Sequence, residues 1–77
     1  MVFEKVRDII ADKLGMSPEE IRMDMGFEDL GADSLDLMEV IMALEDEFDL
    51  TMPEDEASNT KTVADLVQFI QEARGEE

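Results

Sequence analysis

The 77-residue sequence contains no His, Cys, Trp or Tyr, and it has only six Lys and Arg residues against 22 Asp and Glu. Without cysteine, neither a disulfide nor a thiolate metal site can form. Without histidine, the commonest general base and the commonest metal ligand are both missing. The formal net charge of -16 disfavours binding to nucleic acid, which depends on Lys and Arg to displace counterions. The composition therefore indicates a protein that is poorly equipped to be an enzyme by itself.

Long hydrophobic runs are missing as well, and no stretch of the sequence is long enough to cross a membrane. The N-terminus lacks the apolar segment that a signal peptide requires. We therefore expect a single domain over residues 1–77, monomeric, located in the cytoplasm and without membrane insertion. A chain of this length buries only roughly 60 % of its unfolded surface.

The charge is distributed unevenly along the chain. Residues 1–22 hold five acids and four bases, and residues 61–77 hold four acids and two bases, whereas residues 23–60 hold thirteen acids and no base. Runs of like charge are often disordered. This segment is also rich in large apolar residues, which disordered segments lack. We therefore expect it to be folded and strongly negative, a surface suited to basic partners.

The apolar residues recur with the period of a helix, and no run alternates as a strand does. The pattern predicts helices over residues 2–14, 33–49 and 63–73, and a short helix that begins near Pro53 and fades by Thr60. We expect an all-α fold, a small antiparallel four-helix bundle with three main helices, one short helix and a long loop between the first two.

Several of these helix ends carry capping signals. Gly15 is expected at the C′ position of the first helix. Residues 17–20, Ser-Pro-Glu-Glu, form a capping box over a short turn. Thr62 is expected to cap the last helix, with Asp65 three residues on.

The second helix has two apolar faces. One is an ordinary core stripe formed by Leu37, Val40, Ile41, Leu44 and Phe48. The opposite face carries Leu35, Met38 and Met42, with Glu39, Glu45 and Asp46 among them. Single exposed apolar residues are normal. Three together, interleaved with acids, favour a docking surface, and methionine suits such a surface because it repacks easily.

Ser34 stands at the start of this helix. Asp33 is able to cap the helix, so the serine is not needed for that purpose. As a nucleophile it lacks a neighbouring base, because the nearest bases along the chain are Arg22 and Lys61. An exposed hydroxyl that cannot activate itself can still be modified by another enzyme.

No specific cation site is expected. Counted from Asp29, the acidic loop places Gly31, Ser34 and Val40 at the third, sixth and twelfth positions, which excludes an EF-hand. Weak binding of divalent cations is expected at two acidic clusters, formed by Glu45, Asp46, Glu47 and Asp49 and by Glu54, Asp55 and Glu56.

Residues 29–36, Asp-Leu-Gly-Ala-Asp-Ser-Leu-Asp, and residues 42–49, Met-Ala-Leu-Glu-Asp-Glu-Phe-Asp, resemble the acyl carrier proteins of type II fatty acid synthesis. The resemblance extends over essentially the whole chain. It implies that Ser34, with its neighbours Asp33 and Leu35, binds 4′-phosphopantetheine, which a dedicated transferase adds from coenzyme A. The thiol of that arm would hold acyl groups as thioesters, which fits a chain without cysteine.

The same resemblance identifies the second face of the second helix as a recognition surface. Basic patches of fatty acid synthesis enzymes and acyltransferases would dock there, on Leu35, Asp36, Met38, Glu39, Met42, Glu45 and Asp46. Two alternatives stay open from the residues themselves. One is a carrier of a polyketide or an aminoacyl group such as D-alanine; the other is an acidic mimic of nucleic acid, which would leave Ser34 and the apolar face without a role.

The sequence departs from the family pattern at two places. Only Glu28 separates Phe27 from Asp29, where the family commonly has two residues, so either Phe27 packs differently or the loop is tighter. Thr60 stands where the family places a buried isoleucine, which predicts a short or mobile third helix. Because the family stores acyl chains between the second and third helices, Thr60 also bears on the preferred chain length.

Overall fold

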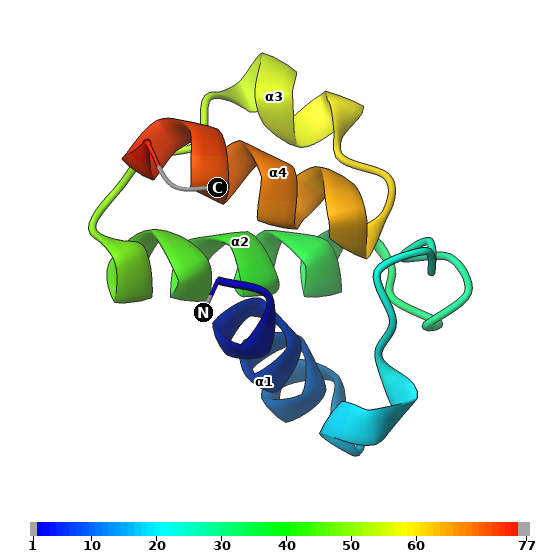
Figure 1. Ribbon diagram of the computed structural model, residues 1–77. Helices are drawn as coiled ribbons and strands as arrows, with labels where there is room; N and C mark the ends of the chain where they lie inside the picture. Colours follow the sequence, from blue (N-terminus) through cyan, green and yellow to red (C-terminus); the bar gives the residue numbers. More distant parts are fainter. Residues whose placement is uncertain (1, 76–77) are drawn as a thin grey trace.

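The computed structural model describes residues 2–75, which form four α-helices and one 3-10 turn. The elements are α1 Val2–Leu14, η1 Pro18–Glu20, α2 Ser34–Phe48, α3 Glu54–Asn59 and α4 Val63–Arg74. Helices α2 and α4 lie side by side and run in the same direction, α1 crosses them obliquely in the opposite direction, and α3 lies at the edge (Figure 1). The predicted all-α fold, with three main helices and a short one, is confirmed. Within residues 2–75, no helix is long and apolar enough to span a bilayer.

The predicted helix caps are also confirmed. Asp33 Oδ1 accepts the Asp36 N–H at 2.9 Å, and Asp36 Oδ2 accepts the Asp33 N–H at 3.3 Å. Gly15 has a φ of 69°, which a side chain would disfavour, and the Met16 N–H reaches back to the carbonyl of Ala11 at 2.9 Å. Because Asp33 caps α2, the Ser34 side chain is free of that role.

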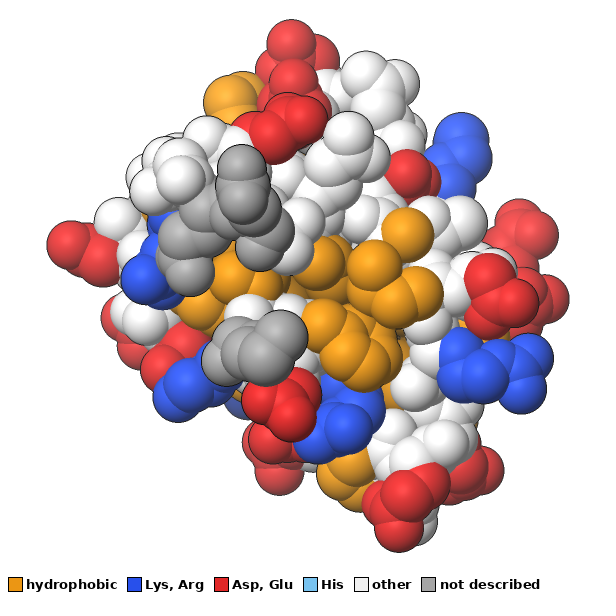
Figure 2. Space-filling model, viewed as in Figure 1, with side chains coloured by type: hydrophobic (Ala, Val, Ile, Leu, Met, Phe, Trp, Pro, Cys, Tyr) orange, Lys and Arg blue, Asp and Glu red, His pale blue; other side chains and the backbone are white. Residues whose placement is uncertain are grey.

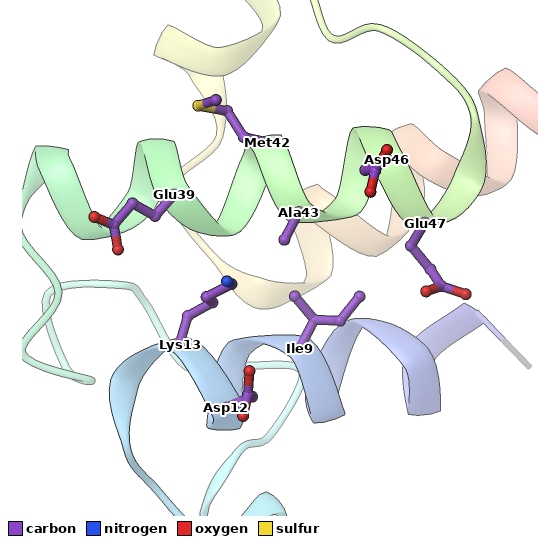
Figure 3. Close-up of a pocket in the computed structure, with 8 residues that line it drawn as sticks. All are labelled: Ile9, Asp12, Lys13, Glu39, Met42, Ala43, Asp46 and Glu47. Carbon is purple, nitrogen blue, oxygen red and sulfur yellow. The ribbon is translucent and has the colours of Figure 1, made fainter.

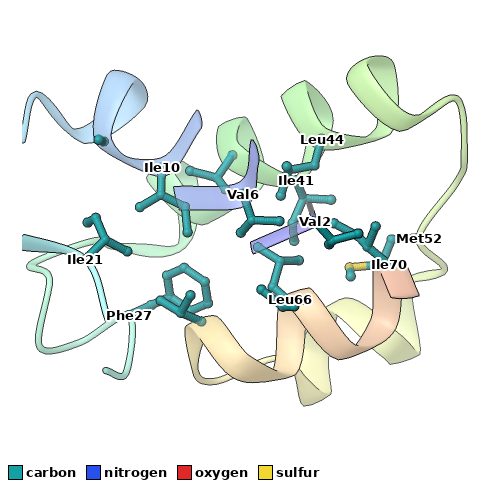
Figure 4. Packing of buried hydrophobic residues seen from close by; sticks show 14 residues of the cluster. Val2, Val6, Ile10, Ile21, Phe27, Ile41, Leu44, Met52, Leu66 and Ile70 are labelled. Carbon is teal, nitrogen blue, oxygen red and sulfur yellow. The ribbon is translucent and has the colours of Figure 1, made fainter. Parts of the chain in front are cut away.

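The hydrophobic core is formed mainly by α1, α2 and α4 (Figure 4). Its largest fully buried side chains are Ile10, Leu44, Leu66, Ile70, Val6, Val40, Val63 and Val67. Phe27 and Ile21 lie at one end of the core, and Met52 lies toward the other (Figure 4). Helix α3 has six residues, which confirms the expectation of a short third helix. None of its residues is buried, so it contributes little to the core.

Phe27 packs into the core despite its short spacing from Asp29. Its side chain is only 5 % exposed and belongs to the core. The loop after it closes through consecutive turns, in which the Leu30 and Ala32 N–H groups donate to the Phe27 carbonyl at 3.2 and 3.0 Å. The short spacing is thus compatible with a buried ring followed by a loop of consecutive turns.

Thr60 is also buried, at 7 % exposure, although it is polar. Its hydroxyl donates to the Glu56 carbonyl at 2.9 Å, which satisfies the group without a partner outside α3. The residue therefore closes α3 with a hydrogen bond where an isoleucine would close it by apolar packing.

Two loops distant in sequence are joined by backbone hydrogen bonds, which we call the loop clip. Phe27 N–H donates to the Lys61 carbonyl at 3.0 Å. Val63 and Ala64 N–H groups donate to the carbonyls of Met25 and Met23, both at 3.0 Å. Residues 23–27 are in this way tied to the start of α4, and the entrance to α2 is positioned against it.

Asp65 supports the loop clip from within α4. Its Oδ2 accepts the N–H groups of Lys61 at 3.0 Å and Thr62 at 3.1 Å, and its own N–H donates to Thr62 Oγ1 at 3.1 Å. The bond from the Lys61 backbone contributes most to lowering the pKa of the Asp65 carboxyl below its usual value of 3.8. The folded state therefore favours the charged carboxylate.

We expect Asp65→Asn to reduce stability at neutral pH, by about 0.5–1 kcal/mol, because the charge-assisted acceptor of two N–H groups is lost. A lowered pKa gives stability that is fully present above the unfolded value of 3.8 and is lost as the pH falls through the folded value. The Tm difference between wild type and variant should therefore be largest near pH 7 and vanish in acid. Thermal melts from pH 7 to 2.5 test this, and a constant difference would contradict it.

The negative charge is only slightly offset by ion pairs. Lys5 pairs with Glu47 at 3.1 Å and Arg22 with Asp24 at 3.4 Å, both exposed, and such pairs contribute little. Acidic side chains surround the rim of the face seen in Figure 2, while hydrophobic ones gather in its middle. Among residues 2–75, no group of three or more acidic side chains is close enough to hold a metal ion. Cations would therefore have to bind diffusely.

We predict marginal stability at low ionic strength, since mutual repulsion of the carboxylates opposes compaction. Millimolar Mg²⁺ or Ca²⁺ should raise Tm; occupation at ten times Kd corresponds to about 1.4 kcal/mol, or about 6–11 °C for a domain of this size. Melts in low-salt buffer, with and without Mg²⁺, measure the effect. The control is NaCl at equal ionic strength, and an equal shift there would reduce the effect to general screening.

Candidate functional site

Ser34 is the first residue of α2, and its side chain is exposed. Two grooves meet at this residue. The loop groove, of about 520 Å³, lies between the loop before α2 and residues 60–62. The α2–α3 groove, of about 920 Å³, runs along α2 from Ser34 to Glu45 under α3. Leu37, Thr60 and Lys61 line both grooves together with Ser34, so a group attached to the serine has access to either one.

The surroundings of Ser34 do not activate its hydroxyl. The charged side chains that line the two grooves are carboxylates, with the single exception of Lys61. A serine nucleophile needs a neighbouring base in hydrogen-bond contact, and the structure shows no hydrogen bond from the Ser34 hydroxyl among the described residues. A negative group on Ser34 would instead be favoured by the N-terminal dipole of α2. The geometry thus suits a serine that is modified and not one that attacks.

The α2–α3 groove has an apolar floor. Leu37, Ile41, Met52 and Ala57 contribute to it, and Met38 and Met42 form its outer rim. Polar groups enter from the α3 side, where Ser58 and Thr60 line it. A groove with this lining suits an elongated apolar ligand, since apolar surface removed from water contributes about 25 cal/mol per Å².

The exposed face of α2 is an apolar ridge, formed by Leu35 at 64 %, Met38 at 58 % and Met42 at 61 % exposure. The exposure that sequence reasoning predicted for these three residues is confirmed. Met42 lines both the α2–α3 groove and a third groove, of about 650 Å³, between α1 and α2. At Met42 the ridge therefore lies between two grooves.

The third groove adds carboxylates to one flank of the ridge. Lys13 and Ile9 point from α1 toward α2, while Ala43 and Glu47 point from α2 toward α1 (Figure 3). The exposed Glu39 and Asp46 line the α2 side of this groove. Both acids lie beside the apolar ridge, as the helical spacing predicted.

Glu45 and Asp36 have roles within the fold that the sequence did not reveal. Glu45 Oε2 accepts the Met52 N–H at 2.7 Å, which anchors the segment before α3 to α2. The Asp36 carboxylate accepts the Asp33 N–H in the helix cap. Both side chains are half-buried. Of the predicted docking acids, Glu39 and Asp46 are therefore the two that are fully exposed to a partner.

Lys61 is the residue at this site that sequence reasoning missed. Along the chain, Lys61 lies 27 positions from Ser34. The loop clip brings the two together by placing the Lys61 carbonyl against the Phe27 N–H. The one available signal was that Lys61 is the first base after a long segment without bases.

Comparison with known proteins agrees with this geometry. Residues 4–70 match the sequence profile of a family described as "Phosphopantetheine attachment site". An acyl carrier protein of Clostridium acetobutylicum is 59 % identical over 71 residues, covering 91 % of this chain and 92 % of that protein. An acyl carrier protein of Clostridium perfringens is 50 % identical over 72 residues, covering 92 % and 95 %.

A solved structure is similar as well. The acyl carrier protein from Enterococcus faecalis, described in connection with its high thermal stability, superimposes with a TM-score of 0.74 at 31 % identity. The match covers 90 % of this chain and 89 % of that one. The likeness thus extends over sequence and fold alike, and over nearly the full length of each relative.

Proposed function

The chain belongs to the acyl carrier proteins of fatty acid synthesis, which bear a covalent 4′-phosphopantetheine, and from this premise we propose that Ser34 is the residue that carries the group. Its exposed hydroxyl at the meeting point of two grooves is the observation that supports this assignment most strongly. Asp33 and Leu35 flank it, the first as helix cap and the second as part of the apolar ridge.

The residues present fit the group. Among the described residues no group accepts a hydrogen bond from the Ser34 hydroxyl, so the phosphopantetheinyl transferase that uses coenzyme A has to supply the base that removes its proton. The chain also offers no cysteine, so the thiol that forms the acyl thioester has to come from the attached arm. The α2–α3 groove supplies an apolar surface next to the attachment point, suited to an acyl chain.

We place the docking of partner enzymes on the apolar ridge and the acids beside it. Leu35, Met38 and Met42 supply contact area, and Glu39 and Asp46 attract basic patches of the transferase and of fatty acid synthesis enzymes. The protein itself acts as a carrier without catalysis of its own, in the cytoplasm. Family membership excludes the alternative of an acidic nucleic-acid mimic.

Ser34→Ala tests the attachment. The variant should keep the wild-type Tm within about 1 °C, because the serine is exposed and Asp33 caps the helix. Incubation with a phosphopantetheinyl transferase and coenzyme A should add one phosphopantetheine to the wild type and none to the variant. Intact-mass measurement of both proteins decides, and an adduct on the alanine variant would show that another residue carries the group.

Charge reversal at Glu39 and Asp46 tests the docking surface. The Glu39→Lys and Asp46→Lys variants should associate roughly tenfold more slowly with the transferase at low salt, and the difference should shrink at high salt. Met38→Ala and Met42→Ala should instead speed dissociation, since they remove apolar contact. Glu19→Lys, an exposed acid on η1, is the matched control. If the Glu39→Lys and Asp46→Lys variants associated with the transferase as fast as Glu19→Lys does, these two acids would be excluded from the docking surface.

A further inference from the structure

Lys61 is the one base that lines the two grooves meeting at Ser34. The other charged residues along these grooves are all acids, which are Glu28, Asp29 and Asp33 in the loop groove and Glu45, Glu54 and Asp55 in the α2–α3 groove. A single positive side chain in such surroundings is the place where a further negative group would be tolerated best.

The backbone of Lys61 is held from two sides. Its N–H donates to Asp65 Oδ2 at 3.0 Å, and its carbonyl accepts the Phe27 N–H at 3.0 Å. The side chain starts from this fixed position in the loop clip and is exposed. Within residues 2–75, its ammonium group forms no hydrogen bond or ion pair. The Asp65 carboxylate interacts with it electrostatically, without an ion pair or hydrogen bond between the two side chains. A fixed backbone with an exposed ammonium group that forms no ion pair is suited to receive an anion from outside the chain.

The other bases are occupied or lie elsewhere. Lys5, Arg7 and Arg22 form ion pairs with acids. Arg74 lies over the Phe48 ring, 5.1 Å from its centroid. Lys13 forms no ion pair among the described residues, but it lines the groove between α1 and α2, which does not include Ser34. Lys61 is thus distinguished from all of them by its position at the proposed attachment site.

We propose that Lys61 is a positioning residue for the prosthetic group: its ammonium pairs with the phosphodiester that joins 4′-phosphopantetheine to Ser34. The inference rests on the proposed function and adds the residue that holds the base of the arm. The phosphodiester brings a negative charge to a site already surrounded by carboxylates, and the N-terminus of α2 and Lys61 are the two features that offset it. The arm is then held at the entrance that the two grooves share.

The experiment compares apo and phosphopantetheinylated forms of the wild type, Lys61→Gln and Lys13→Gln. Both variants remove one charge from an unpaired lysine, and only the first removes it beside Ser34. Thermal melts at low ionic strength should show that attachment lowers Tm more in Lys61→Gln than in the wild type, by roughly 1–5 °C, as expected for an exposed pair. Lys13→Gln should match the wild type, and 0.5 M NaCl should remove the difference.

A second readout observes the phosphodiester itself. The ³¹P resonance of the attached group should differ between wild type and Lys61→Gln, and Lys61→Arg should restore the wild-type shift because it keeps the charge. Equal ³¹P shifts and equal Tm changes in Lys61→Gln and Lys13→Gln would overturn the role of Lys61. Intact mass is measured first: a missing adduct on the wild type would overturn the attachment to Ser34 itself, which separates the two failures.

Discussion

The geometry of the site depends on the hydrogen bonds of the loop clip between residues 23–27 and the start of α4. The chain has no disulfide, and the segment between η1 and α2 contains no helix of its own. Without the loop clip, this segment would be held mainly by the Ile21 and Phe27 side chains in the core. The backbone bonds fix the entrance of α2 against α4, and they place Lys61 beside the groove that begins at Ser34. A set of main-chain contacts therefore determines which side chains surround the attachment point.

Negative charge is a functional requirement that opposes folding. The acids beside the apolar ridge are suited to attract the basic partners proposed above, but the same acids repel one another in the folded chain. Some of the carboxylates accept hydrogen bonds within the fold. Asp33 and Asp36 form the capping box of α2, Asp65 accepts the N–H of Thr62 in the capping box of α4, and Glu45 accepts the N–H of Met52. Each of these carboxylates accepts a backbone N–H group, and at Asp65 such bonds lower the pKa of the carboxyl. Through these hydrogen bonds, some of the acidic residues stabilise the fold of a chain that has a high net charge and a small core.

Local features were predictable from the sequence, and contacts between distant segments were not. The bounds of α1, α2 and α4, the caps at Asp33 and Thr62 and the exposed methionines all follow from helical period and neighbouring residues. The packing of Phe27, the Glu45–Met52 bond and the approach of Lys61 to Ser34 depend on pairs of segments that only the folded chain brings together. The role proposed for Ser34 could be predicted from its immediate neighbours in the sequence, whereas Lys61 has no such local signal.

Helix α3 is attached to the rest of the fold more weakly than the other three helices are, because none of its residues is buried. Separating α1 from α2 or α4 would expose Val6, Ile10 and their partners, which are completely buried. Moving α3 would expose no buried residue of its own, because its anchors are Met52 before it and Thr60 after it. An apolar chain that enters the α2–α3 groove therefore meets least resistance on the α3 side, and its own burial offsets the contacts that α3 gives up. Thr60 closes α3 by a hydrogen bond to Glu56 within the same segment. Helices α1, α2 and α4 hold the core, and with it the start of α2 at the proposed attachment point, without a buried residue from α3.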